Sequence, residues 1–331
     1  SEATAGDIVT AVKINASTFD TLCSPERKVL FEKLSLPVPC YSMAVCSAQG
    51  DESKISTGIQ RILDEDKTLK YEQNESTKEQ ILSGLGEQHL EVTVSKLKNK
   101  FGVDIELKEP KIAYKETIRR KVKAEGKYKK QTGGHGQYGH VWIEFEPCVS
   151  DSLIFEEKVF GGAVPKNYFP AVEKGLQESV KKGVLAGCPV VGLKAILVDG
   201  SYHPVDSSEM AFKTAAIQAF KKGFLEASPV LLEPIVSMKI NVPDKYTGDV
   251  MGDLNKRRGR VLGMNPDAQH KGCTIVEADI PMLSIYGYST DLRSMTGGSG
   301  VFSYEFARYE QAPSDIQEQE IKARQEEGAD A

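Results

Sequence analysis

The sequence lacks any apolar run approaching the roughly 20 residues that a membrane-spanning helix needs. Its first residues, SEATAGDIV, also lack the basic-then-apolar order of a secretory signal peptide. We therefore expect a cytoplasmic protein with no membrane partner.

Cysteine is sparse and unclustered, with six residues in 331 and no C-x-x-C pair. This spacing argues against both a zinc knuckle and a disulfide framework. His135 and His140 are five positions apart and have no carboxylate or thiol at ligand spacing beside them, so we expect no metal site.

An excess of positive charge is also missing, because 42 Lys and Arg stand against 47 Asp and Glu, a net charge of −5. That balance argues against a general nucleic-acid binder. The charge is nevertheless sorted along the chain: seven positive residues between Arg119 and Lys130 face only one acid, Glu125. After Pro313 six acids face two bases, so we expect an acidic C-terminal helix or tail.

The length of 331 residues favours two or three domains. From Pro37 to Leu107 the pattern is strand, helix, two short strands, helix and strand. In the first of these helices the apolar residues recur at helical spacing, as Ile55, Ile59, Ile62 and Leu63. The same order returns between Ile235 and Tyr309. The order βαββαβ is typical of the ferredoxin-like fold, so we predict such a domain on each side of the middle of the chain.

The middle of the chain follows another pattern. One strand is predicted over Ala113–Ala124 and another over Val141–Glu146, with a glycine-rich loop between them. A helix near Pro170 and a second one after Asp206, the expected N-cap, follow. Pro110 and the Ser228-Pro229 and Glu233-Pro234 steps are predicted joints between the three parts.

The segment Gly134–Val141 matches G-x-G-x-x-G-x-V, a pattern found in nucleotide-binding loops. A P-loop requires Lys and then Ser or Thr after its last glycine, whereas His140 and Val141 stand here. The flanks are strands rather than the strand and helix of a dinucleotide fold. A nucleotide-binding enzyme built on Gly134–Gly139 is kept as the alternative of another class. Otherwise the loop is either a plain hairpin turn or an apex that offers amides, an aromatic ring and nearby cations to RNA.

Two further segments carry candidate side chains. The turn Gly200–Ser208 contains Ser, His and Asp, but no G-x-S-x-G elbow occurs and nucleophilic catalysis is not expected. His203 gains interest only if this turn lies beside the glycine loop. The run Lys256-Arg257-Arg258 either offsets a helix dipole or grips phosphates, and the sequence leaves both readings open.

Several of these segments together resemble the C-terminal part of bacterial elongation factor G or an elongation-factor-G-like paralogue. Residues 130–134 and 136–141 resemble the first tip loop of its fourth domain, and residues 200–203 and 205–209 resemble the second tip loop. Further similar segments occur in family order, at residues 20–23, 84–90, 162–165, 187–191, 229–234, 248–254 and 287–294.

The resemblance implies an α+β, multi-domain chain in which two ferredoxin-like βαββαβ domains flank a ribosomal-protein-S5-like α/β domain with a left-handed crossover. The expected parts are the end of domain II as a β-barrel remnant (1–35), domain III (36–110), domain IV (111–228), domain V (229–312) and the acidic C-terminal helix or tail (313–331).

The resemblance also implies a ribosome partner. The domain IV tip would enter the small-subunit decoding region beside tRNA and mRNA, domain V would touch large-subunit RNA, and domain III would relay the state of the protein's own N-terminal GTPase domain. The residues expected to face RNA are Gln131, Gly133, Gly134, His135, Gln137, Tyr138 and His203, with Lys256, Arg257 and Arg258 as a second surface.

Two departures qualify this expectation. These 331 residues contain no P-loop and no N-K-x-D, so we expect no catalytic residue and no cofactor here, with GTP and magnesium held by the intact protein. His135 stands where the main translocase commonly carries Arg, which favours a paralogue. A ribosome-protection factor, which shares the domain layout, is the alternative within the family.

Overall fold

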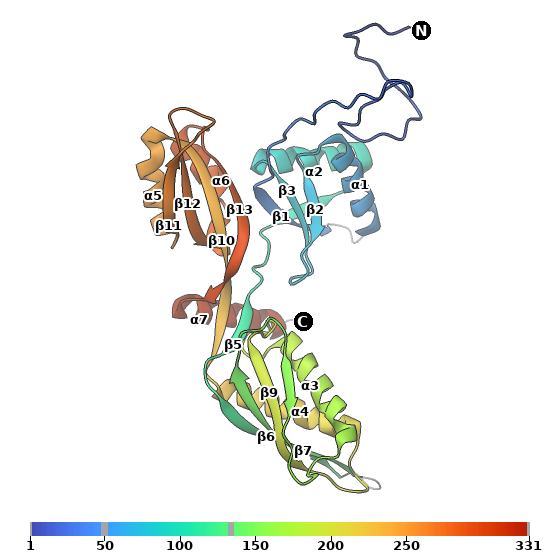
Figure 1. The fold of residues 1–331 in the computed structure, drawn as a ribbon, viewed down its shortest axis with the longest axis vertical. Coiled ribbons are helices and arrows are strands. Elements are labelled where there is room, and N and C mark those ends of the chain that lie inside the picture. The colour runs from blue at the N-terminus through green and yellow to red at the C-terminus, as the bar shows by residue number, and fades with distance from the viewer. Residues whose placement is uncertain (1, 48–51, 132–135, 330–331) are drawn as a thin grey trace. The chain divides into compact units, whose positions relative to one another are not determined.

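The computed structural model describes residues 2–47, 52–131 and 136–329. The chain divides into two compact units (Figure 1), the first formed by residues 1–111, 238–278 and 283–305, and the second by residues 112–237, 279–282 and 306–331. Residues 2–40 contain no helix or strand, so the barrel remnant predicted in 1–35 forms no strand in the described chain.

The first domain with regular structure has the predicted element order. Its strands and helices are β1 (Tyr41–Ser47), α1 (Glu52–Glu65), β2 (Lys70–Gln73), β3 (Gln80–Gly84), α2 (Glu87–Phe101) and β4 (Ile105–Lys108). The sheet order is β2-β3-β1-β4 with every pair antiparallel. Ile59, Leu90 and Leu97 are buried against this sheet. The apolar spacing therefore predicted both helices and the ferredoxin-like order.

The same topology returns near the C-terminus. Its elements are β10 (Pro229–Pro243), α5 (Thr247–Lys256), β11 (Arg260–Pro266), β12 (Cys273–Pro281), α6 (Tyr288–Thr296) and β13 (Val301–Gln311). The order β11-β12-β10-β13 corresponds, element by element, to that of the first sheet. The predicted α+β, multi-domain fold class is thus confirmed.

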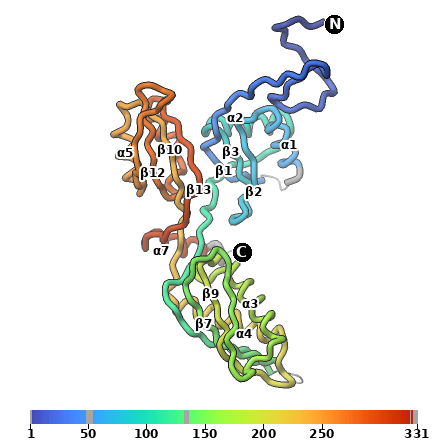
Figure 2. Tube along the Cα trace, viewed as in Figure 1, coloured from blue at the N-terminus to red at the C-terminus, as the bar shows by residue number. Residues whose placement is uncertain are grey.

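The middle domain is a four-stranded sheet covered by two helices. It contains β6 (Val122–Lys130), β7 (Gln137–Pro147), β8 (Ile154–Glu157), α3 (Phe169–Lys182), β9 (Leu193–Ser201) and α4 (Glu209–Glu226), in the sheet order β6-β7-β9-β8. The two helices lie side by side and pack on one face of the sheet (Figure 2). Strands β8 and β9 are parallel neighbours, so the chain crosses over between them through α3. The left hand of that crossover stays a prediction.

Two predictions about the chain path were wrong. The single strand predicted over Ala113–Ala124 is two strands, because Arg119 and Arg120 both donate their N–H to the carbonyl of Ala227 and turn the chain. After that turn β6 joins the middle sheet, whereas β5 (Lys115–Ile118) pairs with β10. The Glu233-Pro234 step is not a joint either, since it lies within the continuous strand β10.

A buried carboxylate in the middle domain organises the loop that follows α3. Glu116 on β5 is fully buried, and its two oxygens accept the backbone N–H groups of Val184, Leu185, Ala186 and Cys188 at 2.8–3.0 Å. These donors belong to the loop that follows α3. A buried charge is tolerated when such hydrogen bonds replace water. The last helix, α7 (Ser314–Ala329), adds a tie nearby, because Gln317 Oε1 accepts the N–H of Leu231 at 3.0 Å.

Helix α4 lies directly on the backbone of the hairpin formed by β6 and β7. A Cβ at Gly126 would lie 2.7 Å from the N of Ala219, and one at Gly139 would lie 2.8 Å from the N of Phe212. The helix meets the strands with small residues, including the fully buried Ala215 and Ala219. Only glycine in the strands leaves room for this approach.

We predict that Gly126→Ala lowers the free energy of unfolding of the middle domain by about 3 kcal/mol, because the added methyl group overpacks the contact with α4. Urea titration followed by the fluorescence of Trp142, the single tryptophan, measures this change. The control is Lys127→Ala, which removes an exposed side chain from the next position and should alter the unfolding free energy by less than about 0.5 kcal/mol. Equal stability of the two variants would contradict the packing argument.

A second prediction concerns alkaline stability. Burial raises the pKa of the Cys188 thiol to about 11 from an ordinary value of 9.0. The unfolded chain then loses this proton near pH 9 while the folded chain keeps it, so stability falls as the pH rises toward 11. Between these limits the wild type should lose about 2–3 kcal/mol more than Cys188→Ala. Urea titrations at several pH values test this, and parallel pH profiles would refute it.

Candidate nucleic-acid interface

The two loops that the sequence singled out meet at one end of the middle domain. The N–H of Tyr138 donates to the carbonyl of Asp206 at 2.8 Å, and the hydroxyl of Ser207 donates to the carbonyl of Tyr138 at 3.0 Å. His203 belongs to the same turn and is about half exposed. The condition that made His203 interesting, a place beside the glycine loop, is therefore met.

Asp206 has a different role from the one predicted. The N-cap of α4 is Ser208, whose hydroxyl accepts the N–H of Ala211 at 3.2 Å. The Asp206 carboxylate instead accepts the N–H of Gly136 at 3.0 Å, across 70 positions in the chain. A Cβ at Gly136 would lie 3.0 Å from this carboxyl group, which explains a glycine there. Asp206 thus joins the second loop to the first.

Part of the first loop lies outside the described residues, namely Gly133, Gly134 and His135. Gln131 is described and exposed. Gln137 and Tyr138 were predicted in a flexible apex, but both are paired residues of β7, with Lys130 opposite Gln137 and Lys129 opposite Tyr138. The strand pairing of β6 extends further toward the tip than the glycine spacing indicated.

A polar network that the sequence did not predict lies next to these loops. His140 Nε2 is 2.9 Å from Glu125 Oε1, and its Nδ1 is 2.7 Å from Ser201 Oγ. The hydroxyl of Ser201 is 2.7 Å from that of Tyr138. The chain of contacts links β6, β7 and β9, and so holds the bases of both loops together. The sequence feature that could have revealed this network is the two-residue spacing of Tyr138 and His140, because it places both side chains on one face of β7.

The geometry of His203 also argues against a nucleophilic triad. Its Nδ1 accepts the backbone N–H groups of Val205 at 3.3 Å and Asp206 at 3.2 Å. This nitrogen therefore serves as an acceptor inside the turn rather than as a base for a neighbouring serine. The rejection of a Ser-His-Asp triad agrees with this arrangement.

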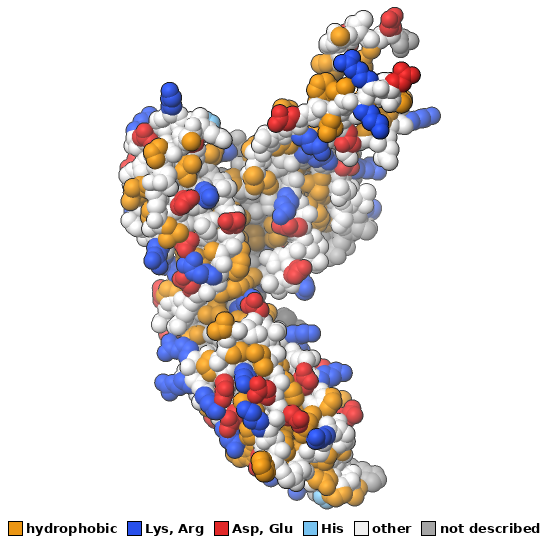
Figure 3. Space-filling view, viewed as in Figure 1, with side chains coloured by type: hydrophobic (Ala, Val, Ile, Leu, Met, Phe, Trp, Pro, Cys, Tyr) orange, Lys and Arg blue, Asp and Glu red, His pale blue; other side chains and the backbone are white. Residues whose placement is uncertain are grey.

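The basic side chains between Arg119 and Lys130 make different contacts. Lys121 binds Glu144 and Glu146, and the hydrogen bonds to these carboxylates, that to Glu146 foremost, raise its pKa above the ordinary value. Lys123 lies over the Trp142 ring with its Nζ 5.4 Å from the ring centroid. Figure 3 shows Lys and Arg interspersed with Asp and Glu over the surface of this domain. Three lysines of this segment that lie nearer the tip are exposed, namely Lys127, Lys129 and Lys130.

The second predicted surface lies in the first unit, after α5. Arg257 Nε donates to Asp253 at 2.7 Å and Nη1 donates to the carbonyl of Ser284 at 3.0 Å. Its guanidinium also pairs with Asp291 and lies 5.2 Å from the centroid of the Tyr288 ring. The side chain is only 18% exposed, so Arg257 is held within its domain. Lys256 and Arg258 are exposed.

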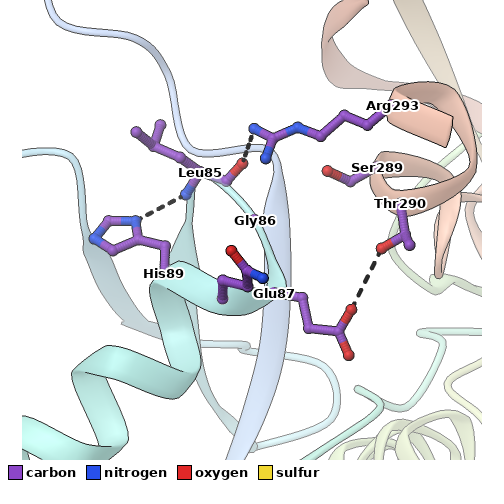
Figure 4. A pocket seen from close by; sticks show the side chains of 8 residues that line it. Leu85, Gly86, Glu87, His89, Ser289, Thr290 and Arg293 are labelled. Atoms are coloured by element: carbon purple, nitrogen blue, oxygen red, sulfur yellow. Dashed lines mark hydrogen bonds between the residues drawn. The ribbon is translucent and has the colours of Figure 1, made fainter. Parts of the chain in front are cut away.

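The first unit also contains a cavity of about 320 Å³ at the N-terminus of α2 (Figure 4). Arg293 from α6 donates to the carbonyl of Leu85 at 3.0 Å. His89 Nδ1 accepts the N–H of Leu85 at 3.1 Å, while its Nε2 lies 3.0 Å from Asp66. In Figure 4 the dashed lines that join α6 to the segment at the start of α2 run from Arg293 to Leu85 and from Thr290 to Glu87.

Residues 2–47, 52–131 and 136–329 lack two further features, a metal site and a membrane-spanning helix. No group of His, Cys, Asp and Glu there could hold a metal ion. No helix in the same residues is both long enough and apolar enough to pass through a bilayer.

Comparison with known protein families covers most of the chain. Residues 36–109 match the model of elongation factor G domain III, residues 110–228 that of elongation factor G domain IV, and residues 230–320 that of the elongation factor G C-terminus. The chain belongs to the elongation factor G family. The predicted similarity to the C-terminal part of that factor is confirmed.

A solved structure is similar to this chain over most of its length. A crystal structure of a protein from Thermus thermophilus is 43% identical in sequence and superposes with a TM-score of 0.76 over 89% of this chain. The chain spans 44% of the length of that protein.

We predict that Asp206→Ala loosens the first loop of domain IV. Loss of the carboxylate leaves the N–H of Gly136 without this acceptor, and a hydrogen bond to a charged group contributes about 1.5–3 kcal/mol. Amide hydrogen exchange at Gly136 should therefore accelerate about tenfold or more. Asp206→Asn, which keeps an acceptor oxygen but not the charge, is the comparison and should exchange at a rate between those of the Ala variant and the wild type. Unchanged exchange in the Ala variant would refute the tie between the loops.

Proposed function

We propose that this chain is the ribosome-contacting C-terminal arm of a translational GTPase, in which the tip of domain IV touches RNA of the small-subunit decoding region. The observation that carries the proposal is that two polar loops meet at one end of the domain, where they are joined by hydrogen bonds of Tyr138, Asp206 and Ser207. In the intact protein this contact would promote tRNA–mRNA translocation or ribosome recycling, coupled to GTP hydrolysis.

The chemistry of the tip suits RNA. Gln131, Gln137 and His203 offer polar side chains, and the lysines at the end of β6 add positive charge without covering the whole domain. Such a site favours contacts to phosphates, 2′-hydroxyl groups and base edges. Gly133, Gly134, His135 and Tyr138 complete the proposed RNA-facing set.

A weaker second contact is proposed for domain V. Lys256 and Arg258 would meet phosphates of large-subunit RNA, whereas Arg257 would support them through its bonds to Asp253 and Asp291. Domain III would respond to the GTPase domain of the intact protein, which would also bind GTP and magnesium. The location that follows is cytoplasmic.

The alternative nucleotide-binding reading of Gly134–Gly139 fits the geometry less well. The N–H of Gly136 is bonded to Asp206, and Gly139 is packed against the backbone of α4, so these glycines already have internal uses. Isothermal titration of this chain with GTP, ATP and NAD separates the readings, because saturable binding would overturn the RNA-contacting arm. A ribosome-protection factor stays the alternative within the family.

The proposed function is tested in the full-length factor that carries this chain. Gln137→Ala together with His203→Ala should slow translocation or subunit splitting about tenfold or more, because contacts at the tip are lost. Ribosome-stimulated GTP hydrolysis should stay within about twofold, since the GTPase domain is unaltered. Lys222→Ala, an exposed change on α4 away from the loops, is the control. If the double variant carried out translocation and subunit splitting at wild-type rates, the proposed contact would be refuted.

A further inference from the structure

The side chain of His203 is about half exposed, and one nitrogen of its ring, Nδ1, faces the inside of its own turn. Nδ1 receives two backbone N–H groups, from Val205 at 3.3 Å and from Asp206 at 3.2 Å. The turn itself is held by Ser207, whose hydroxyl accepts the N–H of His203 at 2.9 Å and donates to the carbonyl of Tyr138 at 3.0 Å. The imidazole therefore has a defined orientation relative to both loops.

These contacts decide which nitrogen carries the proton. A backbone N–H can only donate, so Nδ1 must present a lone pair to Val205 and Asp206. A neutral imidazole has one protonated and one unprotonated nitrogen, and the hydrogen bond at one sets the state of the other. The proton consequently lies on Nε2. The nearest carboxylate oxygen, Asp206 Oδ2, lies 3.4 Å from Nδ1, and the other oxygen of that group is engaged by Gly136.

We propose that His203 is a hydrogen-bond donor of fixed tautomer, which offers Nε2–H to an acceptor atom of RNA at the tip. This inference rests on the proposed function, because it specifies the chemistry of the same contact. Asp206 is the positioning residue: its backbone N–H orients the imidazole, while its carboxylate and carbonyl hold the first loop. The site then selects an RNA group that accepts a hydrogen bond and disfavours one that only donates.

The tautomer is tested first, in this chain and without the ribosome. The chain has five histidines, so ¹⁵N-labelled histidine gives few signals, and the loss of one in His203→Asn assigns it. In its neutral form the His203 ring should show a protonated Nε2 and an unprotonated Nδ1. A protonated Nδ1 would overturn the proposal whatever the protein does on the ribosome.

Two substitutions separate the inner from the outer nitrogen. Asn places an amide oxygen near the position of Nδ1 and keeps the acceptor for the turn, but its amide does not extend to Nε2. Gln extends its amide donor to about the reach of Nε2. His203→Asn should therefore preserve the turn and lose the outer contact, and His203→Gln should restore that contact.

The matched set is assayed for translocation and subunit splitting in the full-length factor. We expect His203→Ala and His203→Asn to be slowed alike, about tenfold, and His203→Gln to recover most of the rate. A wild-type rate for His203→Asn beside a slow His203→Ala would overturn the donor role while leaving the proposed function intact. Wild-type rates for all three variants would remove His203 from the RNA contact, and with it both the donor role and this part of the proposed function.

Discussion

The close contact between α4 and the hairpin of β6 and β7 is the constraint on which the tip depends. Gly126 and Gly139 have no side chain, so the helix backbone lies against the strand backbone, and fully buried alanines fill the remaining space. A helix seated in this way begins at the end of the sheet where the hairpin also ends. The packing of α4 therefore places the turn that precedes it beside the first loop.

Polar contacts then convert this proximity into a defined geometry. Asp206 uses its carboxylate, its carbonyl and its N–H on three different partners, and Ser207 uses its hydroxyl on both loops. Each bond contributes modestly to stability, but together they leave few alternatives for the turn. Below them the contacts of His140 join three strands. Such preorganisation favours the proposed RNA contact, because less conformational entropy is lost on binding.

Local periodicity predicted much of the fold, and contacts distant in sequence account for what it missed. The spacing of Ile55, Ile59 and Ile62 predicted α1. The turn after β5 was missed because its acceptor is Ala227, more than 100 positions away. Asp206 was assigned to the helix cap for the same reason, since its partner Gly136 is distant in sequence. The resemblance indicated which loops meet, but the residue that joins them became visible only in three dimensions.

Charge illustrates why composition alone could not locate the interface. A net charge of −5 argued against nucleic-acid binding, and a cluster of cations argued for it, yet neither count says which cations are available. Lys121 and Arg257 are held by carboxylates of their own domains, so they add little to an external field. Because RNA affinity depends on the cations that can reach phosphates, the charge relevant to the tip is carried by the exposed lysines at the end of β6. A basic patch at one end of a chain with a net charge of −5 favours the proposed RNA contact at that end.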